Sequence, residues 1–339
     1  MNAVDARAAA LSEWIASTLR CRSFSMTPAS EDASFRRYFR IEPKTPFMGE
    51  PTLIAMDAPP PQEDCAPFVR VAGLLREAGV HAPRILAQDL AQGFLLVTDL
   101  GRVTYRAVLD ESNADALFSD ATSTLVRWQL ATRMGALPDY DAPTLLRELE
   151  MFPEWYVARH RGIVLADDER TALSQVFALL IDDHLRQPQV FVHRDFMPRN
   201  LMVCEPNPGV LDFQDARIGP ISYDVVCLFK DAFLSWPEER FLDWTIRYWQ
   251  KAKQAALPVD ADFSAFFRAL EWMGLQRHLK VLGIFARLCY RDGKCNYVED
   301  TPRFLDYVRP VARRYRELAS LAKLIDRIDN VVPQVGYTF

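Results

Sequence analysis

A short polar segment separates two apolar stretches in the middle of the chain. Residues 190–203 read VFVHRDFMPRNLMV, so the cluster HRD and an asparagine five positions after its aspartate stand between two predicted strands. A second aspartate, Asp212 in VLDFQD, follows twelve residues after Asn200. Phosphoryl transfer to a hydroxyl group needs a carboxylate that accepts the proton and oxygen ligands for magnesium. The spacing therefore predicts Asp195 as the catalytic base and Asn200 and Asp212 as the ligands of Mg²⁺.

The apolar periodicity of the remaining sequence indicates which elements hold this segment. Before residue 101 it predicts a helix near the N-terminus, a second helix that stops at Gly79, and several strands. After Gly101 helical patterns dominate, interrupted by the short strands VFV, LMVC and GVLDF. We therefore expect an α+β fold with a strand-rich lobe at residues 1–100 and a larger helical lobe at residues 101–339. The early strands are RYFRI (37–41), PTLIAM (51–56), RILAQDL (84–90) and GFLLVTDL (93–100), and the later helices are 114–133, 144–160, 167–186 and most of 223–328.

The composition argues against several classes of protein. A net charge of −5 over 339 residues is unlike that of a general nucleic-acid binder, which depends on clustered lysine and arginine. No apolar run reaches the length of a membrane span, and the first residues lack the uninterrupted apolar stretch of a signal peptide. We therefore expect a cytoplasmic protein that binds a small molecule rather than nucleic acid or a membrane.

The cysteines and histidines do not indicate a metal centre. The six cysteines show no C-x-x-C spacing, so neither a zinc site nor a disulfide framework is predicted, and most cysteines are expected to be reduced and buried. His81, His160 and His184 are isolated, are not spaced as metal ligands, and are expected to face solvent or to cap helices.

The two polar motifs together resemble the protein-kinase-like superfamily, with HRDFMPRN as its catalytic loop and VLDFQD as its metal-binding segment. The run GVLDFQDARIGPISYDVVCLF resembles the small-molecule branch, the aminoglycoside phosphotransferase and choline kinase group. This resemblance implies a two-lobed kinase-like fold with ATP and Mg²⁺ in its cleft and a hinge in GFLLVTDLG. It also implies that backbone groups of Thr98, Asp99 and Leu100 contact adenine. His193 is expected to anchor the catalytic loop, and Asp224 to tie the loops of the site together.

Structural roles are the alternative for these residues. Asn200 and Asp212 could instead make hydrogen bonds within their loops, and residues 98–100 could be an ordinary strand end. Asp215 is either a second metal ligand or a surface or loop-capping aspartate.

Several stretches resemble a narrower group, the bacterial N-acetylmuramate and N-acetylglucosamine anomeric kinases of cell-wall recycling. The resemblance implies an ATP-dependent kinase that acts on the anomeric hydroxyl of one of these amino sugars. The resemblance to the small-molecule branch implies an acceptor between the catalytic loop and the late helices, where Arg199, Arg287 and Tyr290 are candidate sugar contacts. Surface charge and core packing are the alternative roles of these three residues. The stretches are SFRRYFRI, LIAMDAPPPQEDCAPF, GFLLVTDLG, VLDFQDARIGPISYD and LGIFARLCYRDGK.

The chain departs from the kinase pattern in two places. The segment SEDASFRRYFRI contains no glycine where a glycine-rich loop would cover the phosphates. The strand PTLIAM is followed by Asp57, so Met56 or Asp57 stands where the pattern has a lysine. Because a guanidinium binds phosphate oxygens well, Arg36 or Arg37 is the expected substitute.

Two alternatives to an amino-sugar kinase stay open at this point. One is a kinase of another small acceptor, such as an aminoglycoside or an amino alcohol. The other is a non-catalytic pseudokinase that binds a nucleotide, for which the missing lysine is the main argument. The presence of Asp195, Asn200 and Asp212 together favours a catalytic protein.

Overall fold

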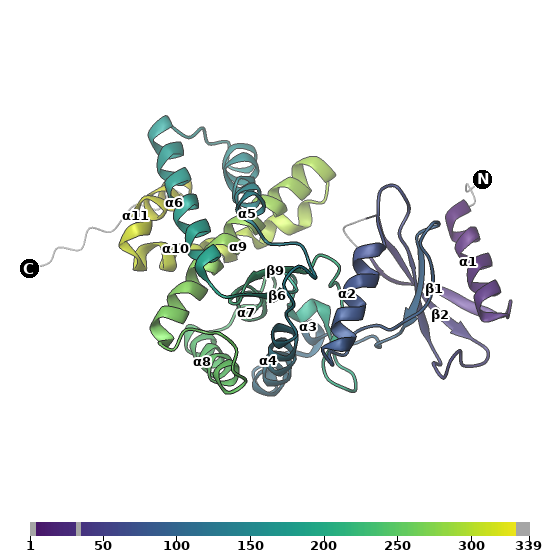
Figure 1. Ribbon diagram of the computed structural model, residues 1–339. Helices are drawn as coiled ribbons and strands as arrows, with labels where there is room; N and C mark the ends of the chain where they lie inside the picture. The colour runs from purple at the N-terminus through teal and green to yellow at the C-terminus, as the bar shows by residue number, and fades with distance from the viewer. Residues whose placement is uncertain (1–4, 32–34, 330–339) are drawn as a thin grey trace, which may run out of the picture. The chain divides into compact units, whose positions relative to one another are not determined.

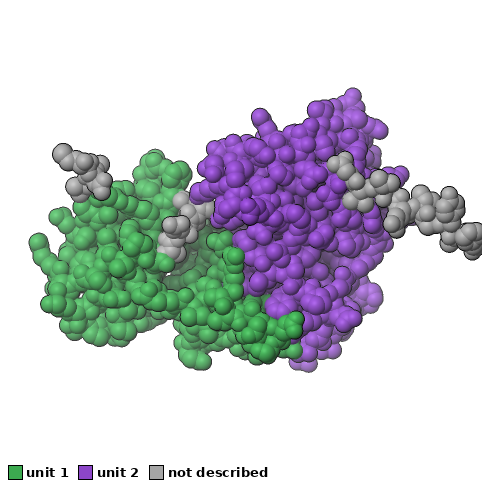
Figure 2. All heavy atoms as spheres, turned by 180° about the vertical axis from the view of Figure 1, so that it is seen from behind, with its two compact units in different colours: residues 1–131, 199–216 green, residues 132–198, 217–339 purple. Residues whose placement is uncertain are grey.

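The computed structural model describes residues 5–31 and 35–329 and separates the chain into two compact units (Figure 2). The first unit comprises residues up to 131 together with 199–216, and the second comprises 132–198 together with the residues from 217 onward. The predicted lobe boundary at residues 100–101 lies inside the first unit and stays a prediction. Within the described ranges, every helix is too short or too polar to cross a membrane.

A five-stranded antiparallel sheet forms the centre of the first unit, in the order β1-β2-β3-β5-β4. Four of its strands are those predicted from the sequence. The edge strand β1 was not predicted, because Pro28 and its small polar neighbours weaken the strand pattern, although an edge position tolerates proline. The strands are β1 (Phe24–Glu31), β2 (Arg37–Pro43), β3 (Leu53–Asp57), β4 (Ile85–Asp89) and β5 (Phe94–Thr98).

Helix α1 (Ala6–Leu19) covers one face of this sheet (Figure 1). The Asp5 side chain caps its N-terminus by accepting a hydrogen bond from the backbone of Ala8 at 3.0 Å. On its inner side Leu11 and Ile15 are fully buried and pack against apolar side chains of the strands, as the periodicity predicts. Strand residues alternate between the two faces, so every second side chain of β2 points away from α1.

The rest of the first unit, as far as the structure describes it, consists of three α-helices and a short hairpin, and α2 (Ala66–Glu77) and the hairpin line a cavity on the opposite face of the sheet. Helix α2 follows β3, and the predicted stop at Gly79 is confirmed by its left-handed φ of +69°. Helices α3 (Tyr105–Val108) and α4 (Ala114–Leu130) precede a short antiparallel hairpin of β7 (Leu201–Met202) and β8 (Gly209–Val210).

The second unit is helical around one long helix, α9 (Phe263–Asp292). Its predicted apolar face, Leu275, Leu279, Leu282 and Ala286, is buried in a core that α9 shares with α6, α10 and the π-helix η1. Strand β6 (Gln189–Val192) pairs with β9 (Arg217–Pro220), which the sequence analysis missed because its residues RIGP include glycine and proline. The other elements are α5 (Ala142–Leu149), η1 (Phe152–His160), α6 (Asp167–Arg186), α7 (Tyr223–Phe229), α8 (Glu238–Gln254), η3 (Cys295–Asp300), α10 (Thr301–Arg314), η4 (Arg316–Leu318) and α11 (Ala319–Ile328).

Two of the expectations about cysteines and histidines are wrong. Cys289 and Cys295 form a disulfide, with Cα atoms 4.1 Å apart, because Gly293 ends α9 in a left-handed conformation and turns the chain back. Their spacing matches no cysteine motif, so the bond could not be predicted from it. His184 is fully buried rather than exposed, since it lies one turn after Leu180 on the buried face of α6.

Gly93 provides a test of how β3 and β5 are joined. Its φ is +73°, and a Cβ atom there would lie 1.9 Å from the carbonyl oxygen of Ala58. We expect Gly93→Ala to lower the free energy of unfolding by at least about 2 kcal/mol, because backbone strain and steric overlap add. In α2, an added Cβ at Gly73 would meet no described atom within 4 Å, so Gly73→Ala should stabilise the protein by roughly 0.5–1 kcal/mol. Urea denaturation of both variants measures these changes. Equal unfolding midpoints for Gly93→Ala and Gly73→Ala would contradict the prediction.

Candidate active site

A cavity of about 490 Å³ lies within the first unit, on the face of the sheet opposite α1. Its volume is in the range of ordinary small-molecule sites. Tyr38 and Arg40 of β2 line it, whereas Phe39 and Ile41 face α1, as the alternation in RYFRI predicts. The cavity brings together six of the predicted site residues: Thr98, Asp99, Leu100, Arg199, Asn200 and Asp212.

The β7–β8 hairpin places Asn200 and Asp212 side by side. Strand β7 begins directly after Asn200, β8 ends two residues before Asp212, and the backbone of Leu211 donates to the Asn200 carbonyl at 2.9 Å. Asp212 has a φ of +62°, a strained conformation for a residue with a side chain. Such strain persists only where surrounding contacts hold the backbone in place.

Two side-chain amides hold the carboxylate of Asp212. Asn200 donates from Nδ2 to Oδ2 at 3.2 Å, and Gln214 donates from Nε2 to Oδ1 at 2.8 Å. Gln214 was not singled out from the sequence, where its position two residues after Asp212 was the only signal. Its Oε1 is buried and has no hydrogen-bond partner in the part of the chain that the structure describes.

The donor atoms around Asp212 suit magnesium. Mg²⁺ prefers oxygen, keeps several waters, and commonly takes one or two carboxylates from the protein. The Asp212 carboxylate and the Asn200 amide oxygen would supply such ligands, and the orphaned Oε1 of Gln214 could accept from a metal-bound water. Among residues 5–31 and 35–329 no cluster of three or more His, Cys, Asp or Glu side chains could hold a metal, and Asp215 is exposed to solvent.

At the end of β5, Asp99 is bound by Arg40. The Arg40 guanidinium donates to both carboxylate oxygens, at 2.5 and 3.0 Å, and to the Gly101 carbonyl at 2.7 Å. Burial opposes ionisation of Asp99, but Arg40 and the Gly101 amide hold its pKa below the ordinary value. Because Arg40 binds the side chain, a contact between Asp99 and adenine would have to use backbone groups, as predicted.

Arg36 and Arg37 have different surroundings. Arg37 faces α1 and binds Asp57 and Asp5, with Nε 3.0 Å from Asp57 Oδ2. Asp57, at one of the two positions considered for the missing lysine, is fully buried and also accepts from Arg7 Nε at 2.9 Å. Arg36 instead binds Glu63 at 2.9 Å, just before α2. Neither Arg36 nor Arg37 belongs to the described lining of the cavity, so their role in phosphate binding stays a prediction.

The glycine-free segment that precedes Arg36 is only partly visible. Residues 32–34 of SEDASF lie outside the described residues. What covers the phosphates in place of a glycine-rich loop therefore stays a prediction.

In the second unit, the catalytic loop is held by Asp224 at the start of α7. Asp224 is fully buried and accepts from the backbone amides of His193 at 2.7 Å and Arg194 at 2.9 Å. His193 is also buried, and its Nδ1 accepts from the backbone of Asp195 at 3.2 Å. This is the arrangement expected of a loop anchor, although the catalytic roles themselves stay predictions.

The candidate sugar contacts are spread over both units. Arg199 is exposed at the edge of the cavity in the first unit. Arg287 and Tyr290 lie near the end of α9 in the second unit, where the Tyr290 hydroxyl is 3.2 Å from His160 Nδ1. Burial and the nearby Arg291 lower the pKa of Arg287, and its buried Nε has no partner among the described residues. A role for these residues in acceptor binding stays a prediction.

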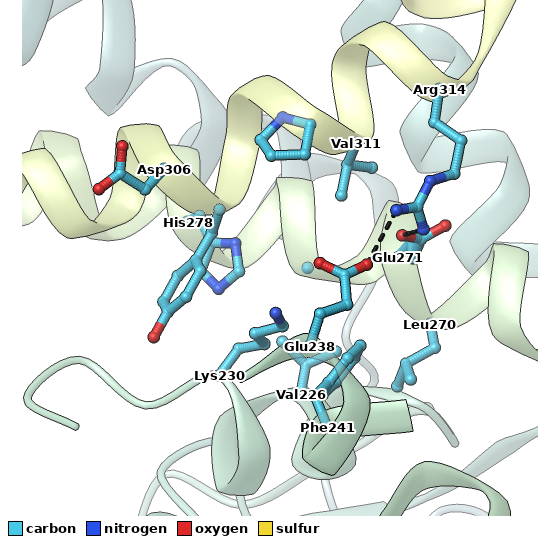
Figure 3. A pocket seen from close by; sticks show the side chains of 13 residues that line it. Val226, Lys230, Glu238, Phe241, Leu270, Glu271, His278, Asp306, Val311 and Arg314 are labelled. Carbon is cyan, nitrogen blue, oxygen red and sulfur yellow. Dashed lines mark hydrogen bonds and ion pairs between the residues drawn. The ribbon is translucent and has the colours of Figure 1, made fainter. Parts of the chain in front are cut away.

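The helical unit has a second cavity of about 30 Å³ (Figure 3). It has room for a water molecule but not for a sugar. Arg314 reaches across it to Glu271 and binds Glu238 at 2.8 Å, and Tyr315 donates to Glu271 at 2.5 Å. This is an ion cluster between α8, α9 and α10.

Comparison with known sequences identifies the family. A sequence model described as "Phosphotransferase enzyme family" matches residues 25–261, which is more than half of the chain. The chain belongs to this family. Two relatives are each named N-acetylmuramate/N-acetylglucosamine kinase. The protein from Pseudomonas aeruginosa is 56% identical over 300 residues, or 88% of this chain and 87% of the relative. The protein from Neisseria meningitidis serogroup B is 47% identical over 334 residues, or 97% and 98% of the two chains.

Solved structures show the same fold at low sequence identity. Choline kinase LicA from Streptococcus pneumoniae superposes with a TM-score of 0.62 at 14% identity, covering 91% of this chain and all of the other. The ADP-bound aminoglycoside phosphotransferase APH(2'')-Ib gives a TM-score of 0.55 at 14% identity, covering 88% and 97%. The predicted two-lobed kinase-like α+β fold is confirmed, as is the prediction of a phosphotransferase acting on a hydroxyl group.

The buried carboxyl group of Asp224 should make the stability of the protein depend on pH. Burial raises its pKa from 3.8 to about 7, despite the two backbone amides that it accepts. Between these values the folded protein binds a proton that the unfolded chain releases, so the contribution of Asp224 to stability falls as the pH rises. We expect the free energy of unfolding, relative to that of Asp224→Asn, to fall by about 2 kcal/mol from pH 5 to pH 8. Urea denaturation across this range checks it, and parallel pH profiles for the two proteins would contradict it.

Proposed function

We propose that the protein is an ATP-dependent kinase that phosphorylates the anomeric hydroxyl of N-acetylmuramate or N-acetylglucosamine in cell-wall sugar recycling. The observation that supports this most strongly is the identity of 56% and 47% to two relatives named for both sugars, over most of each chain. A cytoplasmic location, where ATP is available, is part of the same proposal.

The cavity of the first unit would receive ATP. Backbone groups of Thr98, Asp99 and Leu100 would contact the adenine at the end of β5. Asn200 and Asp212 would hold Mg²⁺, which when bound neutralises charge on the phosphate oxygens. The clamp of two amides on Asp212 supports this assignment, because a metal ligand must be held in a fixed orientation.

Asp195 would accept the proton of the sugar hydroxyl as the γ-phosphoryl group is transferred. An anomeric hydroxyl is more acidic than an ordinary alcohol, so an aspartate is a sufficient base. The paired backbone of the loop supports this role, since His193 and Asp224 hold the segment on both sides of Arg194. Loss of such a base typically lowers the rate by about two to four orders of magnitude.

The acceptor and the base can be tested together. We expect ADP release with ATP and Mg²⁺ on N-acetylmuramate and N-acetylglucosamine, and little or none on free glucosamine, choline or kanamycin. Asp195→Asn should lower the turnover by at least about 100-fold. NMR of the product would show whether the phosphate is on C1. Turnover on kanamycin or choline alone would make the protein a kinase of another acceptor, and nucleotide binding without any turnover would favour a pseudokinase.

We further propose that Arg36, rather than Arg37, takes the place of the missing lysine. Its partner Glu63 stands just before α2, and kinases pair their phosphate-binding lysine with a glutamate of the corresponding helix. Arg37 is engaged by two carboxylates on the α1 face of the sheet.

The two arginines should therefore respond differently to substitution. Arg36→Ala should raise the Michaelis constant for ATP by roughly 10-fold, the expected effect of losing one charge-assisted hydrogen bond. Arg37→Ala should leave that constant within about twofold and lower the stability instead, because it leaves the buried Asp57 with Arg7 as its remaining described cationic partner. Steady-state kinetics and urea denaturation of both variants distinguish these effects. A raised Michaelis constant for ATP in Arg37→Ala but not in Arg36→Ala would show that Arg37 is the phosphate-binding arginine.

A further inference from the structure

A buried ion cluster in the second unit joins the catalytic loop to two helices. Glu148, in the last turn of α5, accepts from Arg194 of the loop, from Lys280 of α9 at 3.1 Å, and from the Tyr140 hydroxyl. The three charged side chains are nearly buried, with 6%, 14% and 13% of Glu148, Arg194 and Lys280 exposed. All members of the cluster belong to the second unit.

The two cations of the cluster also interact with the candidate base. Glu148 faces both Arg194 and Lys280, and the carboxylate of Asp195 attracts the same two side chains. Burial opposes ionisation of Glu148, but Lys280 and Arg194 hold its pKa below the ordinary value. Buried cations without a partner are strongly destabilising, so removing the charge of Glu148 leaves both to interact with Asp195.

Both the backbone amide and the backbone carbonyl of Arg194 are hydrogen-bonded. Its φ is +76°, a conformation that a residue with a side chain adopts only where its surroundings impose it. Its amide donates to Asp224, its carbonyl accepts from Cys227 Sγ at 3.3 Å, and its guanidinium lies over the Tyr140 ring, 5.1 Å from the centroid. Because Asp195 is the next residue, the direction of its carboxylate depends on this conformation.

Lys280 approaches the same loop from α9. Its ammonium donates to Glu148 and, at 3.2 Å, to the Tyr223 hydroxyl. A lysine ammonium has three N–H groups, so these two contacts fix the direction of the third. Glu148 thus orients the ammonium of Lys280 as well as Arg194, the loop residue that precedes Asp195.

We propose that Glu148 is a positioning residue for phosphoryl transfer, which acts through Arg194 and Lys280 to orient the carboxylate of Asp195. This inference rests on the proposed role of Asp195 as the base. Glu148 was not indicated by the sequence, because it lies 46 residues before Arg194 and 132 before Lys280.

The first test compares two buried glutamates of the same unit. Glu148→Gln should lower kcat by roughly 10–100-fold while the Michaelis constants for ATP and sugar change by less than about threefold, since misdirecting the base affects the transition state. Glu271→Gln is the matched control, because Glu271 is equally buried and binds Arg314 and Tyr315 (Figure 3). It should lower stability without lowering kcat. Equal kcat losses in the two variants, or a change in a Michaelis constant alone, would overturn the proposal.

Two further measurements separate positioning from general destabilisation. The double variant Glu148→Gln/Lys280→Met should lose less activity than the product of the single losses, because it removes the unpaired cation along with its partner. If the double variant instead loses activity by the product of the two single losses, a shared role of Glu148 and Lys280 is contradicted.

If Glu148→Gln does not fold, Tyr140→Phe is the alternative variant. It removes one donor to Glu148 and should lower kcat by roughly threefold or more with unchanged Michaelis constants. Unchanged kcat in this variant would overturn the proposal.

Turnover of the two N-acetyl sugars by the wild type tests the proposed function separately and requires no variant of Glu148. In an Asp195→Asn background, Glu148→Gln should have little further effect on the residual rate, because there is no base left to orient. A full additional loss in that background would show that Glu148 acts independently of Asp195.

Discussion

A polar loop that follows a buried strand must pair its own donors and acceptors, because unpaired buried groups are strongly unfavourable. The loop after β6 meets this constraint through one carboxylate. Asp224 receives two consecutive backbone amides, and the imidazole of His193 receives a third. The left-handed turn at Arg194 follows from this pairing, and the direction of Asp195 follows from the turn. Much of the candidate chemistry in the second unit therefore depends on a single aspartate at the start of α7.

The first unit solves a related problem through the two faces of its sheet. Alternation in β2 sends Arg37 toward α1, where it pairs with Asp57, and Arg40 toward the cavity, where it pairs with Asp99. Each of these arginines is engaged by carboxylates on its own side. The cluster SFRRYFR is thus not one basic patch but a set of side chains directed to different partners.

The limits of prediction from sequence follow from the range of each interaction. Asp195, Asn200 and Asp212 could be proposed as site residues because their spacing within one short stretch is itself the signal. The ion pairs around the neighbouring Arg194 could not be predicted, since Glu148 and Lys280 come from helices that are distant in the sequence. Gln214 is near in sequence but carries no motif. The helices and central strands were predictable from apolar periodicity, whereas β9 was not, because pairing with β6 overrides the poor strand propensity of its glycine and proline.

The first unit is discontinuous in sequence, since the hairpin of residues 199–216 belongs with the segment that ends at residue 131. Domains generally fold in the order in which they leave the ribosome. Here the sheet is synthesised first, and the hairpin that completes its unit follows only after the 67 residues of 132–198. The first unit can therefore be completed only after the opening segment of the second unit has been synthesised. A fragment that stops at residue 131 would lack both Asn200 and Asp212, so the first unit with its complete cavity cannot be obtained by simple truncation.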